Sequence, residues 1–212
     1  MASTLKGTPS VVLALGAHPD DVELGCGGSL ARFREAGARI HAAVFSKCAD
    51  ETPDDLHLRA MEYQVAAREL GVKTPIAFDF PNRQLPEHRH AIMGEMEKLQ
   101  ETIEPDLVFI PFLEDPHQDH EAVANAAIRT FRRRETILEF EVLRYGSNSF
   151  TPSFFIDITT TLGQKIAALR HYKSQFQRAY FDEESFRSLA RTRGAQSGYE
   201  YAEGFVIYKM YW

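Results

Sequence analysis

The strongest constraint on the fold is an unbroken apolar run close to the start of the chain. Residues 10–16 (SVVLALG) hold consecutive aliphatic side chains and end in glycine. A strand with one exposed face would alternate apolar and polar residues, so an unbroken run indicates a strand that is buried on both faces. Such strands are typical of parallel sheets covered by helices on both sides. We therefore expect an α/β protein.

Strand-like and helix-like segments alternate through the first two-thirds of the chain. After the first run we expect strands over residues 39–45, 76–80 and 106–111. We expect helices over residues 29–36 (opened by the glycines of 25–28), 56–70, 91–103 and 119–131. Residues 46–55 and 81–90 are polar and predict loops. This alternation predicts a mostly parallel sheet between two layers of helices.

The last third of the chain has a different pattern, and no linker separates it from the rest. We expect strands over residues 139–145, 153–158 and 204–211, and helices over residues 160–172 and 183–193. We therefore predict a single domain, 1–212. Its core would be residues 1–135, and residues 136–212 would be an extension that completes the sheet and the substrate site.

Composition excludes some classes of partner. The net charge is −6, with 44% hydrophobic and 25% charged residues. A protein that binds nucleic acid through its phosphates would carry a basic face, so we expect no nucleic-acid partner. The arginines at 132–134 are the basic run, and we interpret them as the solvated end of a helix.

The sequence also predicts a cytoplasmic location. No apolar stretch approaches the roughly 20 residues that span a bilayer. Residues 1–10 lack the apolar core of a signal peptide. Cys26 and Cys48 are too few for a disulfide framework, which favours a reducing compartment.

Two clusters of histidine and aspartate follow two of the predicted strands. Residues 17–21 (AHPDD) come directly after the first strand, and residues 117–120 (HQDH) follow the strand that ends at residue 111. In the common strand order 3-2-1-4-5-6, the first and fourth strands are neighbours at the point where ligands bind. We therefore expect both clusters to share one crevice.

The residue types in these clusters are those of a catalytic metal site. His18 and Asp21 are three residues apart on a turn that Pro19 restricts. Imidazole and carboxylate ligands suit zinc or iron(II) better than calcium or magnesium. One further histidine would complete three protein ligands and leave a position for a water.

The remaining members of the clusters have several candidate roles. Asp20 lies between the two proposed ligands, and it could take a proton from the water. His117 could polarise a developing oxyanion or protonate a leaving amine. Asp119 could hold a histidine in its tautomer, or it could be the N-cap of the following helix.

These motifs resemble those of a known family. Residues 17–28 (AHPDDVELGCGG) closely resemble the first motif of the PIG-L/LmbE-like zinc-dependent deacetylases. Residues 117–120 resemble the second motif, usually His-Pro-Asp-His, with Gln118 where proline is usual. Residues 172–175 (YKSQ) and 201–205 (YAEGF) are similar to later segments of the family. The resemblance thus spans nearly the whole chain.

The resemblance implies a Rossmann-like, three-layer α/β/α fold of the LmbE type. It also implies a hydrolase that removes the acetyl group from an N-acetylated amino sugar or its conjugate and releases acetate. Zinc, or alternatively iron(II), would be held by His18, Asp21 and His120. Asp20 would be the general base, and His117 would stabilise the tetrahedral intermediate.

The resemblance further implies how substrate and partners are bound. Asn82 and Arg83, on the loop over residues 81–90, resemble a substrate-contacting region, in which we expect Arg83 to bind the substrate. By the same resemblance Tyr201 would bind the substrate and assist the oxyanion. The partner would be a small-molecule N-acetyl sugar or glycoconjugate. Members of the family are often oligomeric, which implies a homo-oligomer.

Other interpretations remain open. Gly25, Gly27 and Gly28 could suggest a nucleotide-binding loop, but their spacing is wrong and the AHPDD turn separates them from the strand. We expect them to permit close backbone approach instead. The competing functions are a metal-dependent amidase for a non-sugar acylated amine, and a non-catalytic nucleotide- or metal-binding module. A mere binding module has no use for Asp20 beside the ligands.

Overall fold

The computed structural model describes residues 8–51, 57–144 and 149–211. The strands are β1 (Val11–Gly16), β2 (Arg39–Val44), β3 (Ile76–Ala77), β4 (Leu107–Pro111), β5 (Thr136–Phe140), β6 (Phe154–Asp157) and β7 (Ala202–Lys209). The α-helices are α1 (Asp21–Glu35), α2 (Leu58–Glu69), α3 (Arg89–Ile103), α4 (Gln118–Thr130), α5 (Leu162–Leu169) and α6 (Glu183–Ser197). Short 3₁₀ turns are η1 (Ala49–Glu51), η2 (Leu85–His88) and η3 (Lys173–Gln175).

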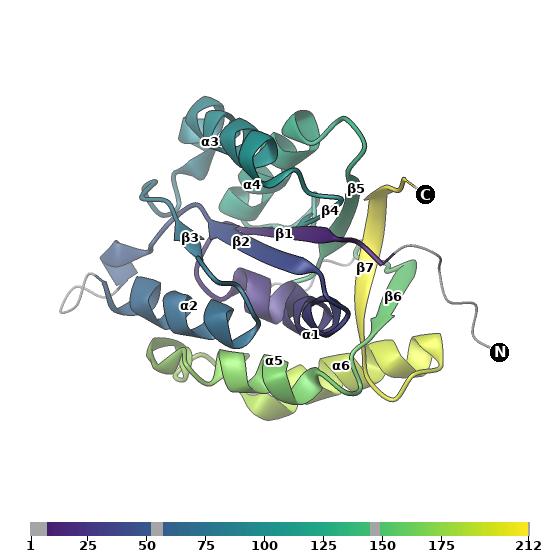
Figure 1. Ribbon diagram of the computed structural model, residues 1–212. Helices are drawn as coiled ribbons and strands as arrows, with labels where there is room; N and C mark the ends of the chain where they lie inside the picture. The colour runs from purple at the N-terminus through teal and green to yellow at the C-terminus, as the bar shows by residue number, and fades with distance from the viewer. Residues whose placement is uncertain (1–7, 52–56, 145–148, 212) are drawn as a thin grey trace.

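The sheet lies between two layers of helices (Figure 1). Helices α3 and α4 cover one face, and α1, α2, α5 and α6 cover the other. Strand β1 shows why both faces must be covered. Val12 and Ala14 belong to the core cluster under α1 and α2, whereas Val11, Leu13 and Leu15 belong to the cluster under α3 and α4. The predicted α/β/α fold with a mostly parallel sheet is confirmed.

The strand order is β3-β2-β1-β4-β5-β7-β6. Strands β3, β2, β1, β4 and β5 are parallel, so their carboxyl ends meet at one edge of the sheet. The expected neighbours β1 and β4 pair directly, with Leu13 opposite Val108. The connection after β1 leads to β2 on one side of this pair, and the connection after β4 leads to β5 on the other. This reversal of strand order creates the crevice where ligands bind in such sheets.

The last third of the chain extends the same sheet. Strand β7 pairs antiparallel with β5 and with β6. The predicted strand over residues 139–145 is misplaced, because β5 ends at Phe140. Val142 and Leu143 instead leave the sheet and line pockets beside it. Three predicted segments (46–55, 56–70 and 139–145) and the amino-terminal segment extend into residues that lie outside the described ranges.

The first helix begins earlier than the sequence indicates. We expected it over residues 29–36, but α1 begins at Asp21, directly after the AHPDD turn. Glycines are poor helix formers, so their presence argued for a later start. Tertiary packing overrides that preference. A β-carbon on Gly25 would lie 2.1 Å from the Phe140 ring, and one on Gly28 would lie 2.9 Å from Ile158. The expected close approach is confirmed.

In the described part of the chain, none of the helices combines the length and apolar character needed to cross a bilayer.

We predict that Gly25→Ala lowers the free energy of unfolding by about 1–3 kcal/mol, because the new methyl group overpacks against Phe140. Gly94→Ala is the matched control, because it lies inside α3 with nothing within 4 Å of its would-be β-carbon. That control should gain about 0.5–1 kcal/mol from helix propensity alone. Urea titration of the three proteins measures both effects. Equal stability of Gly25→Ala and the unsubstituted protein would contradict the close packing of α1 on β5.

A candidate metal centre at the carboxyl ends of the central strands

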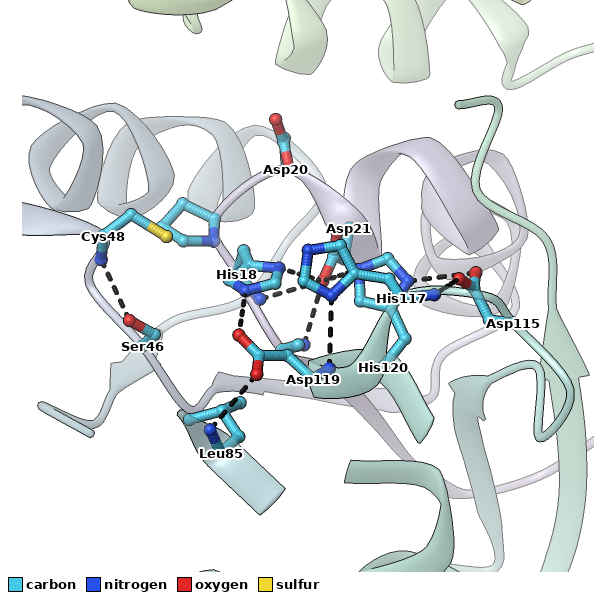
Figure 2. Close-up of polar contacts among 12 residues, drawn as sticks. His18, Asp20, Asp21, Ser46, Cys48, Leu85, Asp115, His117, Asp119 and His120 are labelled. Atoms are coloured by element: carbon cyan, nitrogen blue, oxygen red, sulfur yellow. Dashed lines mark hydrogen bonds and ion pairs between the residues drawn. The ribbon is translucent and has the colours of Figure 1, made fainter. Parts of the chain in front are cut away.

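The first cluster is a tight turn between β1 and α1 that is closed by the carboxylate of Asp21. Its Oδ2 accepts hydrogen bonds from the backbone N–H groups of Ala17 at 2.9 Å and His18 at 2.8 Å. Asp20, which lies between His18 and Asp21 in the sequence, has a left-handed backbone with φ 95°. Neighbouring aspartates therefore point in different directions, and Asp20 points away from the other side chains of the cluster (Figure 2).

The second cluster is the start of α4, which follows β4. His117 is the N-cap of this helix, and its Nδ1 accepts from the backbone N–H of Asp119 at 3.2 Å. The His117 and His120 rings stack with centroids 4.7 Å apart and an interplanar angle of 18°. The expectation that both histidines face one side is confirmed. The cap is His117, so the N-cap alternative for Asp119 is wrong.

The two clusters meet, as the strand order requires. Ligand atoms of His18, Asp21 and His120 lie within 4.8 Å of one another, and all three residues are buried. Asp21 Oδ2 is 3.6 Å from His18 Nδ1 and 3.3 Å from His120 Nε2. Two imidazoles and one carboxylate facing a common point form the donor set of a three-ligand site for a transition metal.

A carboxylate contacts the ring nitrogen of each histidine that faces away from the common point, and so orients the ring. His18 Nε2 lies 2.9 Å from Asp119 Oδ2, and His120 Nδ1 lies 3.0 Å from Asp115 Oδ2 (Figure 2). If each of these nitrogens carries the proton, the opposite nitrogen of each ring keeps the lone pair that a cation requires. This arrangement of histidine and carboxylate is characteristic of protein metal sites.

Asp119 is itself held by the loop before α3. Its Oδ2 accepts from the backbone N–H of Arg83 at 2.7 Å, and its Oδ1 accepts from that of Leu85 at 3.1 Å. His18, His117 and Asp119 also lie close enough to share an ion. The hydrogen bonds that Asp119 already makes favour the orienting role that the sequence left as one alternative.

Electrostatics show that the cluster fits a cation. Burial lowers the pKa of His120, but the carboxylates of Asp21 and Asp115 outweigh burial and raise it to about 10. Burial likewise lowers the pKa of His18, but hydrogen bonds to Asp119 and Asp21 outweigh burial and raise it above its usual value. Three carboxylates around two imidazoles thus favour added positive charge. A divalent ion would supply it.

His117 has the opposite environment. Burial, followed by the nearby His120 and His18, lowers its pKa to about 4. Its Nδ1 accepts the hydrogen bond from Asp119, so the proton of the neutral ring lies on Nε2. A neutral imidazole with a protonated Nε2 can donate a hydrogen bond to an oxyanion.

Asp20 lies in a buried ion pair that sequence reasoning missed. Arg59 of α2 donates through Nη2 to Asp20 Oδ2 at 3.0 Å and to the carbonyl of Pro19 at 3.0 Å. Burial raises the pKa of Asp20, and Arg59 opposes that rise. Nothing in the sequence marks Arg59, which is one arginine in an ordinary helix.

One pocket joins these groups. It is lined by the three candidate ligands, and also by Asp20, Asn82, Arg144 and Tyr180. Of the two residues expected to contact substrate, Arg83 is exposed and its backbone holds Asp119. Tyr201 packs partly buried against the core, and its backbone bonds to Thr159 and Ile158. Their substrate contacts stay predictions. The pocket lining includes Asn82, from the loop region that the resemblance indicated, and adds Tyr180.

Asp115 is the other residue that the sequence analysis missed. It lies five residues before His120, and its Oδ1 also accepts from the backbone N–H of His117 at 2.8 Å. An acidic residue in the same strand-to-helix segment as the motif was the available signal.

The substitution in the second motif leaves the turn intact. Gln118 is the first residue of α4, a position that proline tolerates. His117 has the extended backbone typical before a proline, with φ −83° and ψ 115°. The Gln118 side chain donates to the carbonyl of Arg83 at 3.4 Å. Glutamine therefore keeps the backbone geometry and adds a contact to the neighbouring loop.

Comparisons with known proteins show the family to which the chain belongs. Residues 13–131, more than half of the chain, match the family described as PIG-L: GlcNAc-PI de-N-acetylase. The chain belongs to the PIG-L family. Both clusters of this PIG-L family protein, residues 17–21 and 117–120, fall inside the matched range.

Individual relatives cover between 77% and 95% of the chain. A diacetylchitobiose deacetylase of Thermococcus kodakarensis is 29% identical over 91% of this chain and 81% of its own length. The uncharacterized deacetylase YaiS of Escherichia coli is 32% identical over 77% of this chain and 90% of its own. The conserved protein TT1542 of Thermus thermophilus superposes with a TM-score of 0.80 at 28% identity, covering 95% of this chain and 96% of that one.

We predict that Asp115→Asn weakens zinc binding by about 10- to 100-fold, because the carboxylate that orients His120 loses its charge. Glu121→Gln is the control, because it removes one negative charge from an exposed position on α4, the helix that carries His120. Competition with a chromophoric chelator measures both affinities. Equal affinities for the two variants would contradict the orienting role of Asp115.

Proposed function

We propose that this PIG-L family protein is a metal-dependent N-deacetylase that releases acetate from an N-acetylated amino sugar or its conjugate. The observation that carries the proposal is the pocket in which His18, Asp21 and His120 converge beside Asp20, a buried carboxylate outside the ligand group. A site that only binds a metal has no use for such a carboxylate. The non-catalytic alternative is therefore disfavoured.

Zinc fits the donor set, and iron(II) is the alternative. The three proposed ligands supply two nitrogens and one oxygen, which is a common catalytic arrangement for both metals. When bound, the ion would lower the pKa of a water and polarise the acetyl carbonyl. The oriented imidazoles and the turn-locked Asp21 would hold it without rearrangement.

Asp20 supplies the proton acceptor for the reaction. Its carboxylate takes a proton from the attacking water, and the water oxygen adds to the acetyl carbon. When the C–N bond breaks, the same proton passes from Asp20 to the leaving nitrogen, giving acetate and a free amine. Burial raises the pKa of Asp20, which strengthens it as a base. Arg59 fixes one of its oxygens, so the other, Oδ1, is the one we assign to proton transfer.

His117 stabilises the charge that develops on the carbonyl oxygen. Its Nε2–H is the donor, because Nδ1 is occupied by the helix cap. A neutral donor suits this task, and burial next to His120 and His18 keeps the pKa of His117 at about 4.

The substrate class rests on the relatives. The matched family is described by an N-acetylglucosamine conjugate, and one relative is a deacetylase of diacetylchitobiose. We propose Asn82 and Tyr180 as substrate contacts, because both line the pocket. Arg83 and Tyr201 remain the contacts that the sequence predicts. The proposed partner is a small N-acetylated sugar, and a homo-oligomer remains a prediction from family resemblance.

Two wider predictions accompany this function. We propose that the chain works as one domain, since β6 and β7 extend the core sheet and Tyr180 joins the pocket. We also propose a reducing, cytoplasmic compartment. Its support is that the chain holds two cysteines, Cys26 and Cys48, which are too few for a disulfide framework.

We predict that the purified protein releases acetate from N-acetylglucosamine or its short β-linked oligomers in the presence of zinc or iron(II). Acetate release is measured over a panel that also holds N-acetylated amines without a sugar, with metal content determined in parallel. Activity confined to the non-sugar amides would favour the amidase alternative. Absence of acetate from every panel member by metal-loaded protein would contradict the proposal.

We predict that Asp20→Asn retains the metal but lowers kcat by about 10²- to 10⁴-fold, the usual contribution of a general base. Asp79→Asn is the control, because its side chain is 76% exposed and pairs only loosely with Lys47 at 3.7 Å. Metal analysis and acetate release are measured on both variants. Deacetylation by Asp20→Asn at the unsubstituted rate would show that another group is the base.

A further inference from the structure

Asp20 needs external support to keep its conformation. Its φ of 95° and ψ of −25° place a non-glycine residue in the left-handed region, which costs of the order of 1–3 kcal/mol. Such strain persists only where surrounding contacts fix it. Asp20 is the N-cap of α1, yet its side chain makes no capping hydrogen bond. The groups that fix it must come from elsewhere in the fold.

The backbone of Asp20 is held by a tyrosine from the last third of the chain. Its N–H donates to the hydroxyl of Tyr172 at 3.0 Å, across 152 positions in the sequence. Both residues are buried, with Tyr172 at 0% and Asp20 at 3% exposure. Burial, followed by the nearby Glu23 and Asp20 carboxyls, raises the pKa of Tyr172 well above its usual value, so the phenol stays protonated.

Tyr172 is in turn tied to the helix that holds the Asp20 carboxylate. Two residues after Tyr172, Ser174 donates to Glu62 from its backbone N–H at 2.9 Å and from its hydroxyl at 2.5 Å. Glu62 lies on α2, three residues after Arg59, and Arg59 bonds Asp20 Oδ2. Arg59, Glu62, Ser174 and Tyr172 therefore form a closed bracket around Asp20.

We propose that Tyr172 is a positioning residue for the general base, and that the Glu62–Ser174 link keeps it in place. The bracket fixes the Asp20 backbone through Tyr172 and its carboxylate through Arg59. Asp20 Oδ1, which Arg59 does not bind, is then held in a fixed place at the pocket. A misplacement of about 1 Å can lower a rate by about 10²-fold, so one hydrogen bond behind the base can control kcat. This inference rests on the proposed role of Asp20.

The first test is Tyr172→Phe, which removes only the hydroxyl. We expect kcat to fall by at least about 10-fold, with unchanged KM and zinc affinity, because neither substrate nor metal ligands are touched. Tyr63→Phe is the matched control. Tyr63 is equally buried, and within the described residues its hydroxyl has no hydrogen-bond partner. Its loss should leave kcat unchanged.

A double-mutant cycle separates positioning from general damage. In an Asp20→Asn background the base is already gone, so Tyr172→Phe should lower the residual rate by less than about 2-fold. A fall by the same factor as in the unsubstituted protein would show that Tyr172 acts on something other than Asp20. An unchanged kcat for Tyr172→Phe in an otherwise active enzyme would overturn the inference while leaving the proposed function intact.

Two further measurements keep the test independent of activity. Amide exchange of Asp20, followed by NMR on metal-free protein, should be faster in Tyr172→Phe than in Tyr63→Phe, because only the first variant frees that N–H. Ser174→Ala should shift the Asp20 amide in the same direction and lower kcat by a smaller factor. Unchanged exchange in both Tyr172→Phe and Ser174→Ala would contradict the bracket. If the unsubstituted protein released no acetate at all, that result would instead contradict the proposed function.

Discussion

Parallel pairing of β1 with β4 is the constraint on which the site depends. Because both strands run in one direction, the turn after β1 and the start of α4 emerge at the same edge of the sheet. His18 and Asp21 come from the first segment and His120 from the second. An antiparallel pairing would place the two clusters at opposite ends of the sheet, and the proposed ligand set needs residues from both. The proposed metal centre is therefore a product of topology.

The site concentrates buried charge, and its carboxylates are matched by donors. Asp21 is held by two backbone donors and two histidines, Asp119 by His18 and two backbone donors, and Asp20 by Arg59. Unmatched, such groups would cost several kcal/mol each. The matching leaves an excess of carboxylate over imidazole around the centre, which is the condition that a divalent cation relieves. The hydrogen bonds to the carboxylates stabilise the folded site, and the remaining excess of negative charge favours binding of the ion.

The last third of the chain is fastened to the core by a second buried network. Glu203 of β7 accepts hydrogen bonds from the backbone of Gly28 at 3.0 Å and Ser29 at 2.7 Å in α1, and it pairs with Lys165 of α5 at 2.6 Å. This network locks α5 against α1. The chain after α5 then carries Tyr172 to the backbone of Asp20 and Tyr180 to the pocket. The carboxyl-terminal segment completes the surroundings of Asp20, the proposed base, as well as the sheet.

The sequence by itself determined the fold class and named the candidate residues of the centre. An unbroken apolar run predicts a doubly covered strand, and histidine and aspartate after two such strands predict a metal site at their shared edge. These features are local, so they can be recognised without a structure. Glycines in α1 misled the prediction of its start, because helix propensity is also local whereas Phe140 and Ile158 come from distant segments.

Only the tertiary structure decided which groups support that chemistry. Arg59 and Tyr172 lie 39 and 152 positions from Asp20, and no spacing rule connects residues so far apart. The pocket lining was partly hidden in the same way, since Arg144 and Tyr180 join Asn82 from separate loops. Candidate ligands can be recognised in a motif because short turns fix their geometry. Orienting and positioning residues cannot, because packing between remote elements brings them into contact.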